Sequence, residues 1–114
     1  NQVSAVLKAP FGVFQRIKEA RELLEAASRE VVRIAEKLGI DLTEEDLQNY
    51  IKVIDTLGPQ GKTSMLQDVE AGRKTEVEIF AGTVSELGKK HGVATPVNDF
   101  LLRAIRTLEQ TYQA

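Results

Sequence analysis

Residues 17–39 read IKEARELLEAASREVVRIAEKLG, and the fold class follows from this stretch. Its apolar positions recur in alternating steps of three and four residues: Ile17, Ala20, Leu24, Ala27, Val31, Ile34 and Leu38. This spacing predicts one apolar stripe along a helix of about six turns. Gly39 follows the last apolar position, where a left-handed residue commonly ends a helix. The charged neighbours on this helix, Glu22 with Arg29 and Glu30 with Arg33, predict a solvated face.

The same reasoning predicts helices through the rest of the chain. A second helix should begin after an N-cap at Thr43, which acidic residues follow, and end at Gly58-Pro59. A third should cover about residues 64–71 and a fourth about residues 75–91. The last should begin at Thr95-Pro96, with Thr95 as the N-cap and Pro96 in the first turn. The expected inner faces are Leu47, Ile51, Ile54 and Leu57; then Val77, Phe80, Ala81, Val84 and Leu87; then Val97, Phe100, Leu101, Ala104, Ile105 and Leu108.

The remaining residues add no strand pattern. Residues 4–7 predict the tail of a helix, and Pro10-Phe11-Gly12 predicts a turn. Gly82 and Gly88 mark places where a partner helix could approach closely. The predicted fold class is an all-α, multi-helix single domain.

Composition narrows the function. The chain has 114 residues, of which 42% are hydrophobic and 28% charged, and its net charge is −2. One globular domain is therefore expected, without the basic excess that binds nucleic acid or anionic membranes. With no Cys and a single His, disulfides, thiolate chemistry and multi-His metal sites are excluded, and no metal is predicted. No signal peptide and no apolar run of ~20 residues occur, so we expect a cytoplasmic protein without a membrane partner.

Two motifs suggest functions that their surroundings do not support. Residues 58–64, GPQGKTS, resemble a phosphate-binding loop, which requires a glycine five positions before the Gly-Lys pair. Thr56 occupies that position and a helical pattern precedes it, so the stretch predicts a turn between two helices. His91 stands beside Gly92 at a predicted helix end, where an interaction with the helix dipole is favoured over catalysis.

A third stretch carries more than a helical pattern. Residues 63–78 read TSMLQDVEAGRKTEVE, with Ser-Met at a helix start and then Gly-Arg-x-Thr-Glu-hydrophobic-acid. This block closely resembles the signature of the ketopantoate reductases (2-dehydropantoate 2-reductases), in their C-terminal helical domain. The resemblance continues through Gly82, His91-Gly92-Val93 and residues 94–98. At the front, NQVSAV resembles the family's Asn-Pro-Leu-Thr/Ser-Ala-Leu stretch, so essentially the whole chain is covered.

The resemblance implies the second half of a two-domain oxidoreductase. The helical domain would resemble the C-terminal domain of 6-phosphogluconate dehydrogenase, and an N-terminal Rossmann domain, absent from this chain, would bind NADPH. Family members reduce 2-dehydropantoate, a small 2-keto acid, to pantoate in pantothenate biosynthesis, with a lysine as proton donor. That lysine would lie before residue 1, so no catalytic residue is predicted here. Because no Gly-x-Gly-x-x-Gly occurs in the chain, we expect the isolated chain to bind no NADPH and to be inactive.

Three residues match the family's site positions. Ser64 matches the substrate-binding Ser before Met, and a hydroxyl at a helix start suits a substrate carboxylate. Asn1 matches the third position of the family's Lys-x3-Asn-x3-Asn pattern and would bind the substrate's polar groups. Glu76 matches the Glu at the junction of substrate and cofactor and is assigned to cofactor binding. Phe11 and Gly61 depart from the pattern, because some members carry Asn at these positions.

A purely structural interpretation stays open for these residues. Ser64 could be only an N-cap, Glu76 could only begin a helix, and Arg73 could only bridge to Asp68 or Glu70. At the level of the whole chain, the alternative is a non-enzymatic helical module for dimerisation or interaction. A homodimer is also expected to cover the apolar surface at Val3, Val6 and Leu7. The identity of the 2-keto acid and the preference for NADPH over NADH stay open.

Overall fold

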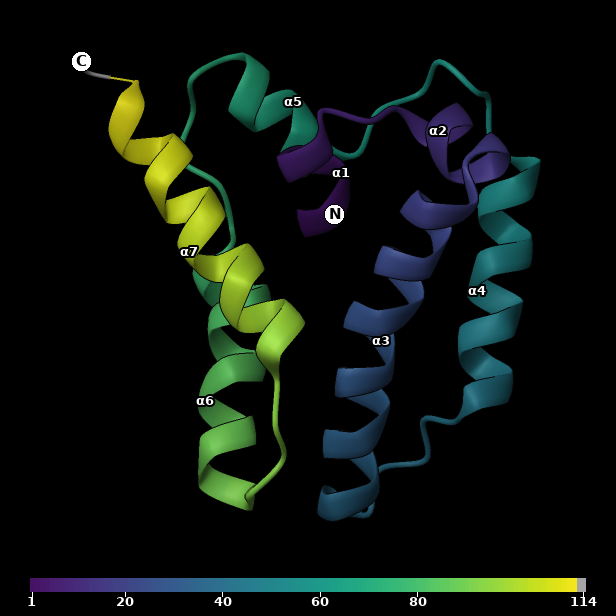
Figure 1. Cartoon of the computed structure of the whole chain (residues 1–114), viewed down its shortest axis with the longest axis vertical. Coiled ribbons are helices and arrows are strands. Elements are labelled where there is room, and N and C mark those ends of the chain that lie inside the picture. The colour runs from purple at the N-terminus through teal and green to yellow at the C-terminus, as the bar shows by residue number, and fades with distance from the viewer. Residues whose placement is uncertain (113–114) are drawn as a thin grey trace.

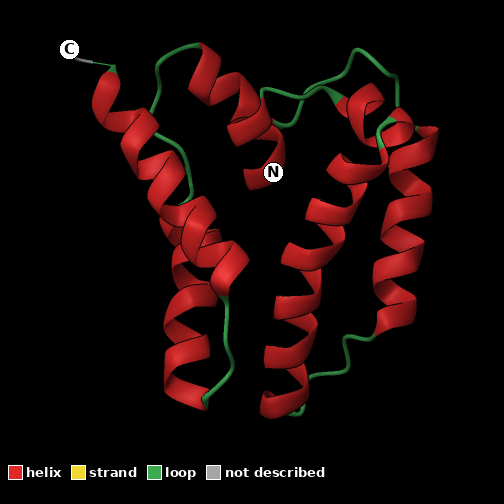
Figure 2. Cartoon of the chain, viewed as in Figure 1, coloured by secondary structure: helices red, strands yellow, loops and turns green. Residues whose placement is uncertain are grey.

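The computed structural model describes residues 1–112, which form a helical domain without strands (Figures 1 and 2). The predicted all-α fold class is therefore confirmed. The elements are α1 (Gln2–Leu7), α2 (Phe11–Arg16), α3 (Lys18–Leu38), α4 (Glu44–Thr56), α5 (Ser64–Glu70), the π-helix η1 (Glu78–Gly82), α6 (Thr83–His91) and α7 (Pro96–Thr111).

Two helix pairs stand side by side in Figure 1, α3 with α4 and α6 with α7, and short helices lie at one end. Helix α1 packs against α5 and α7, and α3 packs against both α6 and α7. The N-terminus lies between the two pairs, next to the start of α5 (Figure 1). Because α3 contacts both α6 and α7, it joins the two pairs, and α1 attaches α5 to α7.

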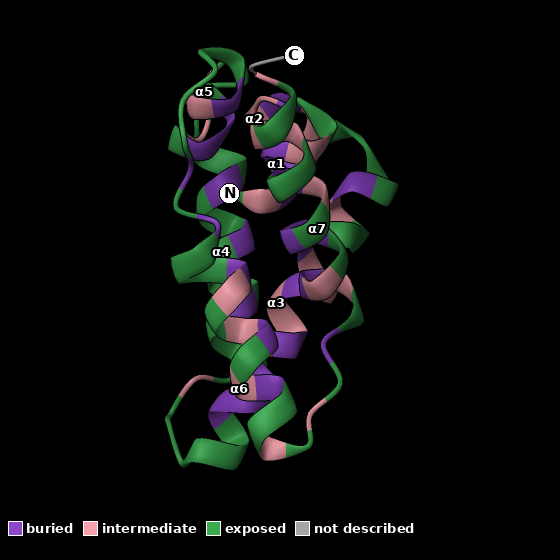
Figure 3. Ribbon diagram, turned by 90° about the vertical axis from the view of Figure 1, so that its left-hand side faces the viewer, coloured by how far each residue is buried: buried purple, intermediate pink, exposed green. Residues whose placement is uncertain are grey.

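The core consists of two apolar clusters joined through α1 and α7. Val3 of α1 and Leu101 of α7 belong to one cluster, and Ala5 and Leu102 belong to the other. The first cluster adds Ala9, Phe14, Ala20, Leu24, Ala27 and Ile54, and the second adds Met65, Val69, Val77, Ala81 and Ile105. Buried and exposed residues alternate along the helices in Figure 3, as expected for helices with one apolar face. The predicted periodicity therefore identified about half of the residues in the two clusters. Phe100, also predicted to lie inside, is 60% exposed.

The helix boundaries in the first forty residues match the prediction with two corrections. The long helix exists and ends at Gly39, whose φ is 70°. However, Ile17 is its N-cap in extended conformation, and its side chain is 42% exposed. The predicted turn at residues 10–12 is also wrong beyond Pro10, because α2 begins at Phe11 with Pro10 as its N-cap. The chain bends at Ile17 because α2 must turn to pack against both α3 and α4.

Helix α4 follows the prediction closely. The Thr43 side chain accepts a hydrogen bond from Asp46 N, and the Asp46 side chain accepts one from Thr43 N, which forms a capping box. Leu47, Ile51 and Ile54 are buried as expected. Leu57, the fourth predicted position, is 37% exposed because it follows the last helical residue.

The predicted helix over residues 75–91 begins later than expected. Residues 73–77 are not helical, the π-helix η1 follows, and regular α-helix starts only at Thr83. Thr75 does not begin a helix as predicted: its N–H donates to Glu109 of α7 at 2.6 Å, and its hydroxyl accepts from Val77 N at 3.2 Å. Phe80, predicted to be inside, is 41% exposed. Gly88 does mark a close approach: a Cβ built there would lie 2.7 Å from Thr95 Cγ2, in the loop before α7.

The start of α7 brings the clearest correction. Pro96 begins the helix as predicted, but the Thr95 side chain makes no capping bond and donates instead to Asp99 Oδ1. The carboxylate of Glu30, on α3, accepts hydrogen bonds from Val97 N and Asn98 N, both at 2.9 Å. Glu30 is only 1% exposed, so its assignment to a solvated face is wrong.

Candidate functional site

Asn1, Ser64 and Glu76, the three predicted site residues, line one pocket of about 110 Å³. Met65, Asp68 and Phe80 complete its lining. These six residues come from the first residue of the chain, from α5, from the turn after α5 and from η1. The fold therefore places the three residues that the family pattern grouped around one pocket.

A buried hydroxyl explains why Asn1 lies beside the start of α5. Ser4 Oγ donates a hydrogen bond to Asn1 O at 2.9 Å and lies 2.5 Å from Thr63 Oγ1. Thr63 Oγ1 also accepts from Leu66 N at 3.1 Å. Ser4 is 2% exposed, so this chain of bonds ties α1 to α5 inside the protein. Ser4 and Thr63 had no assigned role in the sequence analysis, because their pairing spans 59 positions.

Ser64 is the first residue of α5, and its side chain does not cap the helix. The capping bond is made by Thr63, one residue earlier. The interpretation of Ser64 as only an N-cap is therefore wrong. Its side chain is exposed toward the pocket, and its hydroxyl has no hydrogen bond to any residue in 1–112. A hydroxyl in this state can donate to a bound ligand and accept from one.

Glu76 lies in the turn between α5 and η1. Gly72 reverses the chain with a φ of 71°. Arg73 forms an ion pair with Asp68 at 3.0 Å, one of the two partners expected for it. Glu76 does not begin a helix, since η1 starts two residues later. The residue is exposed and, within residues 1–112, its carboxylate makes no hydrogen bond or ion pair. It is thus a free acceptor at the pocket.

A larger apolar groove adjoins this pocket. It has a volume of about 440 Å³ and shares Asn1 and Phe80 with the pocket. Its further lining comes from α1, α3, α4, η1, α6 and α7: Gln2, Val3, Leu24, Ala27, Ser28, Val31, Tyr50, Ile79, Thr83, Val84, Leu87, Asn98 and Leu101. The polar pocket therefore opens next to a mostly apolar surface.

The two departures from the family pattern turn out to be neighbours. Phe11 N donates to Gly61 O at 2.9 Å, and a Cβ built on Gly61 would lie 3.0 Å from Phe11 Cδ2. A side chain at position 61 would therefore press on the Phe11 ring. Neither residue lines the pocket of Ser64 and Glu76.

The other motifs have structural roles. Residues 58–63 connect α4 to α5, as predicted for the Gly-rich stretch, and Lys62 pairs with Glu70 at 2.9 Å. His91 is the last residue of α6, next to the left-handed Gly92. Across residues 1–112, no group of three or more His, Cys, Asp or Glu side chains could hold a metal ion. Among the same residues, no helix has the length and apolar character needed to span a bilayer.

Comparison with known proteins identifies the family of the chain. Residues 1–109 match the family described as ketopantoate reductase PanE/ApbA, C terminal. The 2-dehydropantoate 2-reductase of Aquifex aeolicus is 32% identical over 113 residues, which covers 96% of this chain and 36% of that protein. The chain thus spans about a third of the length of this relative.

Solved structures share the fold. Dimeric ketopantoate reductase from Staphylococcus aureus superposes with a TM-score of 0.89 at 20% identity, covering 97% of this chain and 39% of that one. D-mandelate dehydrogenase in a ternary structure with NADH and anilino(oxo)acetate gives a TM-score of 0.86 at 25% identity, covering 100% of this chain and 48% of that one. On the match over residues 1–109 and the shared fold, the chain belongs to the ketopantoate reductase family, as its C-terminal domain.

Proposed function

We propose that this chain is the substrate-side domain of a reductase that converts a small 2-oxo acid to a 2-hydroxy acid with NADPH. A Rossmann domain preceding these residues in a longer protein would bind most of the cofactor. The observation that supports this proposal is that Asn1, Ser64 and Glu76 line the same pocket. Two of these residues carry neutral polar groups and the third an acceptor carboxylate, which suits a ligand with both donors and acceptors.

Each residue has a role that its chemistry allows. The Ser64 hydroxyl donates a hydrogen bond to the substrate carboxylate, since no residue in 1–112 competes for it. The Asn1 side-chain amide binds a second polar group of the substrate. Both interactions exist before the reaction starts, so they contribute to substrate binding more than to the chemical step.

The resemblance assigns Glu76, which lines the pocket, to the junction of substrate and cofactor. The residues present fit a nicotinamide there, because its carboxamide N–H can donate to an exposed carboxylate that has no partner in residues 1–112. The bound cofactor supplies the hydride that reduces the ketone. The Glu76 carboxylate orients either this carboxamide or the proton donor of the reaction.

The resemblance assigns proton donation to a lysine before Asn1. In the family's Lys-x3-Asn-x3-Asn pattern, residues four apart lie on one face of a helix. Asn1 directly precedes α1, so an extension of this helix would carry the lysine on the same face as Asn1. Since this donor and the dinucleotide fingerprint lie outside residues 1–114, we propose that the isolated chain does not catalyse the reaction.

Known relatives support the substrate class. The Aquifex relative is named for 2-dehydropantoate, and the D-mandelate dehydrogenase holds anilino(oxo)acetate, which also carries an oxo group beside a carboxylate. We assign to this chain only the shared 2-oxo acid group. We also propose a cytoplasmic protein that forms a homodimer. The dimeric relative from Staphylococcus aureus and exposed apolar residues such as Ile79, at 65% exposure, support the dimer. Of the residues expected at its surface, Leu7 is 44% exposed, but the expectation for Val3 is wrong, because Val3 is 4% exposed and belongs to the core.

The test uses the longer protein that contains these residues. Oxidation of NADPH and NADH is followed with 2-dehydropantoate and a panel of other 2-oxo acids. Ser64→Ala should raise KM with little change in kcat, because ground-state binding weakens. Glu76→Ala should lower kcat/KM by about 10²–10⁴-fold, because a group that orients the reacting partners is lost.

Gln67→Ala is the matched control, because Gln67 is exposed on the same helix and does not line the pocket. It should retain wild-type kinetics. If the wild-type protein reduces no 2-oxo acid with either cofactor, the proposed activity is wrong. If it is active and both site variants behave like Gln67→Ala, the activity stands and the assigned roles are wrong.

A further inference from the structure

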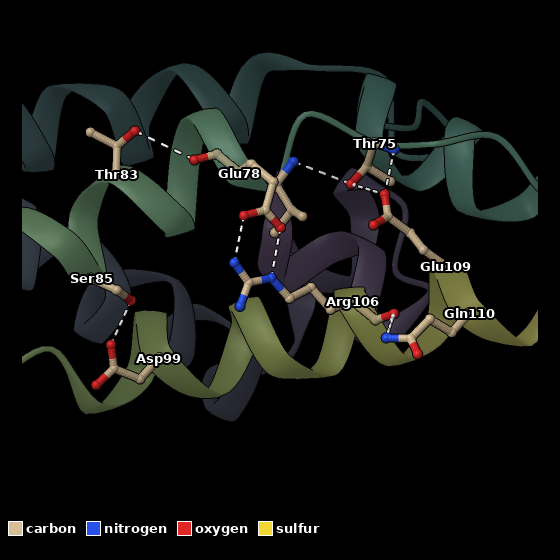
Figure 4. A network of polar contacts seen from close by, with 9 residues as sticks. Thr75, Glu78, Thr83, Ser85, Asp99, Arg106, Glu109 and Gln110 are labelled. Carbon is tan, nitrogen blue, oxygen red and sulfur yellow. Dashed lines mark hydrogen bonds and ion pairs between the residues drawn. The ribbon is translucent and has the colours of Figure 1, made fainter.

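The segment that carries Glu76 is held from both sides by α7 (Figure 4). Glu109 Oε2 accepts hydrogen bonds from Thr75 N at 2.6 Å and from Thr75 Oγ1 at 2.9 Å. Three positions earlier on the same helix, Arg106 donates to both carboxylate oxygens of Glu78, at 2.7 and 2.5 Å. Thr75 precedes Glu76 and Glu78 follows it. Two side chains from one face of α7 therefore bind the turn before and after Glu76.

Thr75 also closes the turn over Glu76. Its hydroxyl donates to Glu109 and accepts from Val77 N at 3.2 Å. Thr75 is 5% exposed and Val77 is fully buried. The two neighbours of Glu76 are therefore fixed inside the protein, while Glu76 itself is exposed at the pocket. Because its carboxylate has no partner within residues 1–112, the direction of this side chain depends on the backbone of this turn.

We propose that Glu109 is a positioning residue for Glu76: it fixes the turn at Thr75 and so aims the Glu76 carboxylate into the pocket. The proposal rests on the proposed function, because a positioned carboxylate matters only if Glu76 meets a ligand. Side chains that orient reacting groups must hold them to within about half an ångström, and their own neighbours provide this restraint. No motif of the sequence indicated Glu109, since it lies 34 positions from Thr75.

The contribution of Glu109 should exceed that of Arg106. The side chains of Arg106 and Glu78 are about half exposed, at 48% and 49%, and water competes for such a pair. The bonds of Glu109 reach a buried residue and include a backbone N–H, which has no other partner if the carboxylate is removed. Both bonds use one carboxylate oxygen. The amide oxygen of a glutamine can therefore replace that oxygen.

The experiment compares variants of the longer protein under saturating cofactor. Glu109→Ala should lower kcat about tenfold or more, because the turn loses its anchor and small displacements of reacting groups are costly. KM for the 2-oxo acid should change by less than about twofold, since Ser64 and Asn1 are untouched. Glu109→Gln should recover most of the lost kcat. Gln110→Ala is the control, because Gln110 is exposed and donates only to Arg106 O of its own helix.

A double variant separates positioning from general destabilisation. If Glu109 acts through Glu76, Glu76→Ala with Glu109→Ala should be no slower than Glu76→Ala alone. A merely structural role predicts instead that the two losses multiply, and that result would overturn the proposal. Thr75→Val keeps the shape of the buried side chain and removes its hydroxyl. It should lower kcat in the wild-type background and leave it unchanged in the Glu76→Ala background, even if Glu109→Ala does not fold.

The remaining outcomes are also decisive. If Glu76→Ala impairs the enzyme while Glu109→Ala and Thr75→Val do not, the positioning role is wrong and the proposed function stands. If Glu76→Ala has no effect in an active enzyme, both the role of Glu76 and the positioning role fall.

Discussion

Two glutamates of this domain occupy opposite environments. Glu30, at the junction of α3 and α7, is 1% exposed and accepts from Val97 N, Asn98 N and Asn98 Nδ2 at 2.7–2.9 Å. Glu76, in the turn before η1, is exposed and has no partner within residues 1–112. The Asn98 amide also donates to Ala27 O at 3.0 Å, so the junction around Glu30 is saturated with hydrogen bonds.

The difference shows how the fold uses the same side chain for two purposes. A buried carboxylate at the start of a helix satisfies N–H groups that have no acceptor within that helix and complements the helix dipole. Within residues 1–112 Glu30 forms no ion pair, so hydrogen bonds from these N–H groups stabilise its carboxylate. An exposed carboxylate with no such partner contributes little to stability. The first glutamate therefore holds two helices together, and the second is free to meet a ligand.

The largest expected effect comes from removing the buried carboxylate. Glu30→Ala should lower the free energy of unfolding of the chain by about 3 kcal/mol, because three donors, two of them buried, lose an acceptor and α7 loses its cap. Glu76→Ala should change it by less than about 0.5 kcal/mol, as expected for an exposed side chain without contacts. Urea unfolding followed by circular dichroism measures both values.

Glu30→Gln sharpens this comparison. It keeps the shape and one acceptor oxygen but places an N–H₂ group against donors, so its loss should lie between those of Glu30→Ala and Glu76→Ala. Equal stability of Glu30→Ala and Glu76→Ala would contradict the division into a structural and a free glutamate.

A smaller effect separates the adjacent hydroxyls Thr63 and Ser64. Thr63→Ala should cost about 1 kcal/mol, since its side chain caps α5 and contacts Ser4. Ser64→Ala should leave the unfolding free energy unchanged within about 0.5 kcal/mol. Thermal unfolding of the two variants, compared with wild type, measures this difference in stability. A greater loss for Ser64→Ala would restore the capping interpretation of this residue.

The smallest expected effect is a loss of folding stability at acidic pH, caused by Asp99 in the first turn of α7. Ser85 Oγ donates to Asp99 Oδ1 at 2.5 Å and Thr95 Oγ1 donates at 2.9 Å. These hydrogen bonds, with help from the charges of Arg103 and Lys89, hold the pKa of Asp99 below its ordinary value against the opposing effect of burial. A lowered pKa means that the ionised carboxylate stabilises the folded chain above the unfolded pKa of 3.8.

This stability should disappear as the pH falls through the lowered pKa of folded Asp99. Unfolding curves between about pH 5 and pH 2 measure the loss. Asp99→Asn should be less stable near neutral pH and should show a shallower decline in acid. If wild type and Asp99→Asn decline in parallel, the hydrogen bonds of Asp99 do not contribute in this way.

Local patterns predicted most of the elements for physical reasons. The apolar stripe of α3, the left-handed Gly39 and the capping box at Thr43 all depend on residues within a few positions of one another. Two of the errors share one cause. The role of Thr75 and the cap of α7 each depend on a distant partner, Glu109 for Thr75 and Glu30 for α7. Spacing along the chain contains no information on such pairs.

The candidate site divides in the same way. The grouping of Asn1, Ser64 and Glu76 came from a family pattern, and the fold places all three around one pocket. The bonds that bring them there, from Ser4 to Thr63 and from Thr75 to Glu109, join α1 to α5 and the turn to α7. Serine, threonine and glutamate are common on exposed helix surfaces, so nothing in the local context of these four residues indicated their pairing.

Helix positions and the apolar faces arise from interactions within a few residues, and these are encoded locally along the chain. Whether a given charged residue is buried or free is decided by the packing of whole helices. Glu30 becomes a cap because α7 starts against α3, and Glu76 stays free because α7 grips its neighbours and leaves its side chain at the pocket. Burial of a side chain depends on which helix surfaces meet. A hydrogen bond to a carboxylate depends on the donor–acceptor distance to within tenths of an ångström. Both are therefore set only in the assembled tertiary structure.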